Sequence, residues 1–138
     1  MRRSWQFENP IDGGSDGPDV DQFRVEIAPD RDVVHVSPVG EIDMSTAGEL
    51  AAEMQRLRRS GFAYVVLDLR DATFIDSTGL HLILQEHAAA KADGGGFAIR
   101  RGPPAVQRIF DVTGLESRLP FLDGAAGNDG ALPSRRPR

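Results

Sequence analysis

The chain has 138 residues, of which 40% are hydrophobic and 27% are charged, and these values are typical of a globular protein with a single domain. The absence of cysteine excludes a disulfide framework and any thiolate metal site. The formal net charge of −5 argues against direct binding to nucleic acid, because such binding depends mainly on cations that meet phosphates.

Both ends of the chain are poor in the apolar residues that a packed core needs. Residues 1–22 are rich in glycine, proline and aspartate, and the residues from 124 onward are rich in glycine, alanine, proline and arginine. We therefore expect a disordered leader over residues 1–22, a domain over residues 23–122 and a flexible tail over residues 123–138. Acidic residues interrupt the leader before it could form a signal peptide, and no run reaches the roughly 20 apolar residues of a membrane span. We expect a cytoplasmic protein with no membrane contact.

The domain is predicted to begin with a β-hairpin. Residues 23–27 alternate apolar and polar side chains, which predicts a strand with one face in water, and residues 29–32 supply turn-forming side chains. Residues 33–39 are the second arm, and the chain leaves this strand at Gly40. The hairpin is therefore expected to add an antiparallel strand to the sheet.

The first helix is predicted from a capping pattern. Thr46 is followed three residues later by Glu49, and this spacing lets a hydroxyl and a carboxylate bond the free N–H groups of a helix start. Apolar residues then recur on one stripe, at Ala47, Leu50, Met54 and Leu57. The preceding turn contains Asp43, whose carboxylate serves either as a local acceptor for N–H groups or as part of a functional surface.

The most apolar strand of the chain leads to its best-marked helix start. Residues 64–69 are short, β-branched and almost unbroken in apolar character, which is typical of a strand buried on both faces. Asp76, Ser77, Thr78 and Gly79 then precede a helical spacing of apolar residues, so Ser77 is expected at a helix N-terminus. This helix ends at the glycine run 94–96, which lacks the Lys-Ser/Thr pair of a phosphate-binding loop. The histidines also lack metal-ligand spacing, so no cofactor is expected.

The remaining elements alternate in the same way. Residues 97–100 are predicted to form a strand, two prolines at 103 and 104 open a third helix, and residues 119–122 are predicted to form a short last strand. Strands that alternate with helices predict an α/β fold with a mostly parallel sheet, flanked by helices. The loops 40–46 and 71–78 both follow the carboxyl ends of strands, so this topology can bring them to one surface.

Three interpretations of Ser77 follow from its chemistry and position. It belongs to a group of residues that can cap the second helix, with a contribution of about 1 kcal/mol. It could be a catalytic nucleophile, but Ile75 replaces the first glycine of a nucleophile elbow, and no matched base is evident in the sequence. It could also accept a phosphoryl group that switches the binding of a partner.

A family resemblance favours the third interpretation. Residues 74–80, Phe-Ile-Asp-Ser-Thr-Gly-Leu, follow a Val-Val-Leu-Asp-Leu strand, and together they resemble the phosphorylation-site segment of bacterial anti-sigma factor antagonists, which are small proteins of the STAS domain family. Residues 40–43 with the following Thr46 and Ala47 resemble the family's first-loop motif, and residues 104–110 with 113–115 resemble its last helix and turn. The resemblance covers the expected domain and leaves both tails outside.

The resemblance implies a single STAS domain that is a ligand and substrate rather than an enzyme. It implies that the unphosphorylated protein binds an anti-sigma factor that is also a serine kinase, so that a sigma factor is released. It further implies that phosphorylation of Ser77 ends this binding and that a phosphatase restores it. The partner-binding face is then expected to include Asp43, Asp76, Ser77, Thr78 and Gly79. Other STAS domains imply an alternative, a scaffold or sensor module that docks on a larger signalling complex or transporter.

Overall fold

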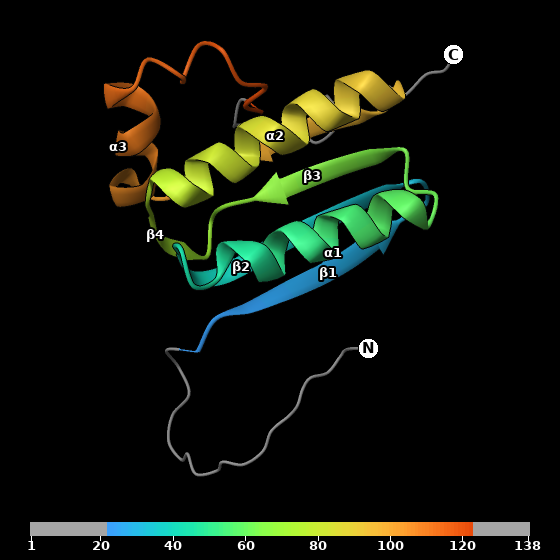
Figure 1. Cartoon of the computed structure of the whole chain (residues 1–138), viewed down its shortest axis with the longest axis horizontal. Coiled ribbons are helices and arrows are strands. Elements are labelled where there is room, and N and C mark those ends of the chain that lie inside the picture. Colours follow the sequence, from blue (N-terminus) through green and yellow to red (C-terminus); the bar gives the residue numbers. More distant parts are fainter. Residues whose placement is uncertain (1–21, 123–138) are drawn as a thin grey trace, which may run out of the picture.

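A computed structural model describes residues 22–122, so the predictions for residues 1–21 and 123–138 lie outside the described residues. The described chain contains five strands and three helices (Figure 1). In chain order these are β1 Arg24–Asp30, β2 Val33–Ile42, α1 Ala47–Arg59, β3 Tyr64–Asp68, β4 Ala72–Ile75, α2 Ser77–Asp93, β5 Gly96–Arg100 and α3 Pro104–Val112. Within residues 22–122, no helix combines the length and the apolar character needed to cross a bilayer.

The sheet is mixed and mostly parallel, which confirms the predicted fold class. The strand order is β1-β2-β3-β5, and β4 pairs with β2 outside this path. Only the β1–β2 pair is antiparallel among the strand pairs of the described region, and it is the predicted hairpin. The hairpin turn is at Arg31 and Asp32, where Arg31 has a positive φ of 65°.

Strand β2 is longer than the sequence predicts and organises the sheet around itself. Its first residues pair with β3, from Val33 opposite Tyr64, and its last residues pair with β4, up to Ile42 opposite Ile75. The prediction that the chain leaves this strand at Gly40 is therefore wrong, and β4 was not predicted at all. The register shifts between Gly40 and Glu41, because Gly40 lies opposite Ala72 while Glu41 lies opposite Phe74. One residue of β4, Thr73, is extra at this point.

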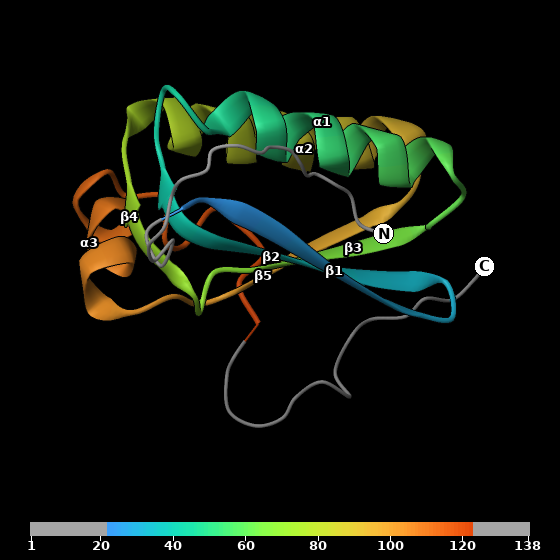
Figure 2. The same ribbon diagram turned by 90° about the horizontal axis from the view of Figure 1, so that it is seen from below.

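The helices form a layer over one face of the sheet and a cap at one end. Figure 2 shows α1 and α2 together on the same side of the sheet, while α3 lies beside β4 at the end of the sheet. The predicted stripe of α1 is buried, as are the larger side chains that α2 and α3 turn inward. Each large apolar side chain that leaves water stabilises the fold by about 1.5–3 kcal/mol. The fully buried side chains of this core include Ile42, Leu50, Met54, Leu67, Ile83, Ile99, Val106 and Phe110.

The helix ends follow the sequence signals in two cases. Gly94 ends α2 in a left-handed conformation with φ of 77°, which glycine adopts without a steric penalty. Pro104 is the first residue of α3, where its missing N–H is not needed. The predicted last strand, in contrast, is reduced to a single bridge between Ile99 and Phe121.

Candidate functional site

The two loops expected on one surface are joined by a backbone hydrogen bond. Because β2 and β4 are parallel neighbours, Ile42 lies opposite Ile75 at the carboxyl ends of both strands. The N–H of Asp76 then donates to the carbonyl oxygen of Ile42 at 3.1 Å. The turn that begins at Asp43 and the helix that begins at Ser77 therefore leave the sheet side by side, as the predicted topology allowed.

Asp76 caps α2, which decides which residue of the Asp-Ser-Thr triplet has that role. Its backbone is extended, and its Oδ1 accepts hydrogen bonds from the N–H groups of Thr78 at 2.9 Å and Gly79 at 3.1 Å. These are two of the N–H groups that a helix start leaves without an internal partner. Ser77 is thus the first residue of the helix, and its hydroxyl is not needed for capping.

The Ser77 side chain is exposed, and so is that of Thr78. Within residues 22–122 the Ser77 hydroxyl makes no hydrogen bond, so no described base lies in contact with it. An exposed hydroxyl at the positive end of a helix is open to modification from solution. The same part of the chain contains no group of three or more histidine, aspartate or glutamate side chains placed to hold a metal ion.

Asp43 shapes the turn beside Ser77. Its carboxylate accepts hydrogen bonds from the backbone N–H of Ser45 at 2.9 Å and the hydroxyl of Ser45 at 2.8 Å. These two bonds, first the hydroxyl and then the backbone N–H, hold the pKa of Asp43 below its ordinary value of 3.8. The carboxylate is therefore a local acceptor, as one of the two interpretations expected, and its place on a partner-binding face stays a prediction.

Thr46 belongs to this turn and does not cap α1, so the predicted capping box is wrong. Its hydroxyl accepts from the N–H of Asp43 at 2.9 Å and donates to the carbonyl oxygen of Glu41 at 2.7 Å, and no side-chain cap is formed. The hydroxyl thus ties the end of β2 to the start of α1. The capping pattern was misleading because the same residue types also build compact turns.

Gly79 is buried and holds the start of α2 close to the sheet. A Cβ atom at this position would lie 2.8 Å from Ile42 Cγ2, 2.8 Å from Ile75 Cγ1 and 3.0 Å from the carbonyl oxygen of Ile42. Real Cβ atoms do not approach other atoms so closely. Among the five residues expected on the partner-binding face, Gly79 is therefore buried and lets α2 pack closely on the sheet. Ser77 and Thr78 are exposed.

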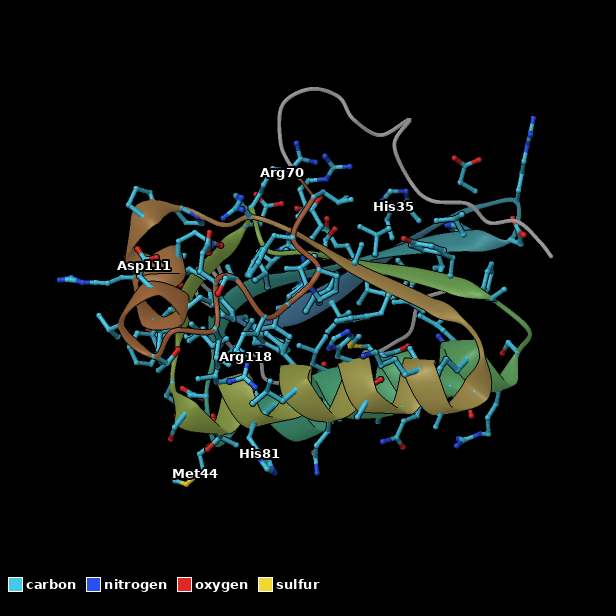
Figure 3. All side chains as sticks on the ribbon, turned by 90° about the horizontal axis from the view of Figure 1, so that it is seen from above. His35, Met44, Arg70, His81, Asp111 and Arg118 are labelled. Atoms are coloured by element: carbon cyan, nitrogen blue, oxygen red, sulfur yellow. The ribbon has the colours of Figure 1, made fainter. Side chains whose placement is uncertain are left out.

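Two large apolar side chains near this surface were not singled out in the sequence. Met44 is 74% exposed in the turn after β2, and Phe74 is 47% exposed on β4. Figure 3 shows Met44 and His81 pointing away from the body of the domain, on the side of α1 and α2. Met44 stands among polar turn residues and outside the stripe of α1, and this was the signal that could have found it.

The comparisons with known proteins agree with this geometry. A sequence model of the STAS domain family matches residues 24–124. The chain belongs to the STAS domain family. The match begins at the first residue of β1 and extends beyond the single bridge at Phe121, so it covers every described helix and strand.

Individual known proteins are similar to this chain over most of their length. The anti-sigma F factor antagonist of Paenibacillus polymyxa is 31% identical over 102 residues, which are 73% of this chain and 87% of that protein. The crystal structure of an anti-sigma factor antagonist from Mycobacterium paratuberculosis has a TM-score of 0.65 and 29% identity, and the match covers 81% of this chain and 92% of that one. The Bacillus cell fate determinant SpoIIAA in its phosphorylated form shares the fold, with a TM-score of 0.58 and 20% identity over 80% of this chain and 96% of that one.

Proposed function

We propose that this protein is an anti-sigma factor antagonist that is switched by phosphorylation of Ser77. Its unphosphorylated form binds an anti-sigma factor that is also a serine kinase, and the sigma factor held by that protein is released. The kinase then modifies Ser77 and ends the binding, and a phosphatase restores the original form. The observation that carries the proposal is the exposed Ser77 hydroxyl, which makes no hydrogen bond in the described chain and lies beside the Asp43 turn.

The helix start explains why phosphorylation would leave the fold intact. A phosphate adds about −1.5 to −2 charges, and near a helix N-terminus such charge is favourable by roughly 0.3–1 kcal/mol. The N–H groups of Thr78 and Gly79 are already bonded to Asp76, so a phosphate on Ser77 is not expected to rearrange the first turn of the helix. The modified group remains at the surface, directly after Asp76 in the chain and beside the Asp43 turn.

Inhibition therefore acts on the complex and not on the domain. A dianion placed in an interface built around a neutral hydroxyl meets desolvation and like-charge costs of several kcal/mol. Each 1.4 kcal/mol changes the affinity about tenfold, so two such units separate a bound from a free antagonist. The names of the relatives support this function, since both the Paenibacillus and the Mycobacterium proteins are anti-sigma factor antagonists.

The test is to incubate the purified protein with candidate anti-sigma kinases and ATP and to locate the phosphate by mass spectrometry. We expect the group on Ser77, and Ser77→Ala should abolish the modification while Thr78→Ala, the matched control, should retain it. Phosphate on Thr78 with Ser77 unmodified would contradict the assignment of the acceptor.

Binding should follow the modification. Isothermal titration with the same anti-sigma factor should show tight binding for the wild type and Ser77→Ala, weak binding for Ser77→Asp, and weaker binding still for the phosphorylated protein. Aspartate carries one charge and fewer acceptor oxygens than phosphate, which is why its defect is smaller. Equal binding by all four folded forms would favour the scaffold or sensor function instead.

A further inference from the structure

Among the described residues, three large apolar side chains are strongly exposed, at Met44, Phe74 and Val112. Isolated exposed apolar residues are common on protein surfaces and by themselves indicate nothing. Met44 differs because of where it is held. It is 74% exposed, it lies in a turn fixed by hydrogen bonds on both sides, and that turn leaves the sheet beside the start of α2.

The backbone of the turn cannot easily move to bury this side chain. The carbonyl oxygen of Asp43 accepts from the N–H groups of Thr46 at 3.0 Å and Ala47 at 2.8 Å. The carboxylate of Asp43 and the hydroxyl of Thr46 close the turn from the other side, through Ser45 and Glu41. Met44 is the one residue between Asp43 and Thr46 whose side chain takes no part in this network, and it projects into solvent (Figure 3).

The turn and the acceptor serine share one surface. Met44 is two residues after Ile42, and Ser77 is one residue after Asp76. The N–H of Asp76 donates to the carbonyl oxygen of Ile42 at 3.1 Å, and this bond holds the two segments together. A partner that covers the Ser77 hydroxyl must therefore approach the turn as well. An apolar side chain at that place gives the contact an anchor that does not depend on charge.

We propose that Met44 is an anchor of the complex and inserts into an apolar pocket of the anti-sigma factor. The inference rests on the proposed function and adds a second determinant to it. Ser77 decides whether the partner can bind, and Met44 supplies affinity in the state that binds. A thioether chain with three rotatable bonds suits this role, because it can adapt to the shape of a pocket and makes many dispersion contacts. Asp43 and Thr46 are positioning residues for Met44.

The test is titration of the anti-sigma factor with the full chain carrying Met44→Ala, with Val112→Ala as the matched control. Val112 has the same exposed fraction of 74% and is the last residue of α3, on a different element from the turn. We expect Met44→Ala to weaken binding about tenfold or more, as the removal of an interface anchor does, and Val112→Ala to leave the affinity unchanged. Thermal melts should be unchanged for both, because neither side chain is buried.

Two further measurements identify the nature of the contact. Met44→Leu should retain most of the affinity, whereas Met44→Gln, which keeps the length but is polar, should lose it. The loss caused by Met44→Ala should be the same at low and high salt, because an apolar contact is not screened.

The outcomes separate the two proposals. If Met44→Ala binds like Val112→Ala while Ser77→Asp binds poorly, the anchor is refuted and the phosphorylation switch stands. If the wild-type protein binds no anti-sigma factor, the proposed function fails and the anchor fails with it. If Met44→Ala loses affinity and also has a lower melting temperature, the loss counts against a direct contact. The direct contact stands if Met44→Gln weakens binding while its melting temperature is unchanged.

Discussion

Gly79→Ala tests whether the start of α2 is held against the sheet by the missing side chain. Alanine is normally the better helix former, by about 1 kcal/mol over glycine in a helix interior. At Gly79, however, the new Cβ would meet two side chains of the core and one backbone carbonyl at 2.8–3.0 Å. The two neighbours, Ile42 and Ile75, are almost completely buried, so neither can move out into solvent to relieve the contact without leaving the core.

The gain in helix propensity and the cost of overpacking have opposite signs and similar sizes, so the predicted change in the free energy of unfolding is their difference. Overpacking a well-packed core costs about 1–3 kcal/mol, and part of the contact here is with backbone, which yields less than a flexible side chain. After subtraction of the gain of about 1 kcal/mol in helix propensity, the net loss is centred near 1 kcal/mol. For a domain of this size that loss lowers the Tm by about 4–8 °C.

The assay is thermal and denaturant unfolding of Gly79→Ala beside Gly48→Ala. Gly48 is also near the start of a helix, but a Cβ there meets nothing within 4 Å. Gly48→Ala should therefore stabilise the protein, by up to about 1 kcal/mol. If both variants gain stability by similar amounts, the close approach of α2 to β2 and β4 does not exist in solution, and the reasoning about the site geometry fails.

Three other predictions concern stability and domain limits. Asp76→Ala should cost about 1 kcal/mol in the free energy of unfolding, because it removes the acceptor of two N–H groups, and chemical denaturation measures this loss. Burial, and then the charge of Lys91, lower the pKa of His87 below 6.5, so the wild type should lose stability as the pH falls below about 6.5. His87→Gln should lack that part of the loss in melts between pH 7.5 and 5.5, and identical pH profiles would contradict it. A fragment of residues 21–123 should melt cooperatively and bind the anti-sigma factor with the affinity of the whole chain, and a tenfold weaker complex would show that the tails belong to the site.

The sequence predicted the elements whose signals are local and unbroken. The apolar run of β3, the stripe of α1 and the start of α2 depend on residues within one element, and the structure has them where they were expected. The mostly parallel sheet with one antiparallel hairpin strand then followed from the alternation of strands and helices. The meeting of the two loops was predicted from strands that end at one edge of the sheet, and the structure forms it through β4, a strand that was not predicted.

The parts that were missed depend on contacts between distant segments. Strand β4 has the burial pattern buried, exposed, exposed, buried, because the register shift breaks the alternation that marks a strand in a sequence. The role of Thr46 was decided by its contact with Glu41, five residues earlier, which a capping pattern does not contain. The exposure of Met44 depends on the closed turn around it and not on its own residue type.

The register shift between β2 and β4 adds one residue to the chain that connects β3 to α2. With Thr73 as the extra residue, Phe74 lies opposite the exposed Glu41 and Ile75 lies opposite the buried Ile42. Deletion of Thr73 would remove the extra residue and leave Ala72, Phe74 and Ile75 in regular alternation, with Phe74 outward and Ile75 inward. Surface connections usually tolerate insertions and deletions, but between Ile75 and Ser77 one residue more or less would displace the serine from the Asp43 turn. Changes of length among natural relatives should therefore accumulate in the tails, in other turns and at the extra residue of β4, and be rare between residues 75 and 77.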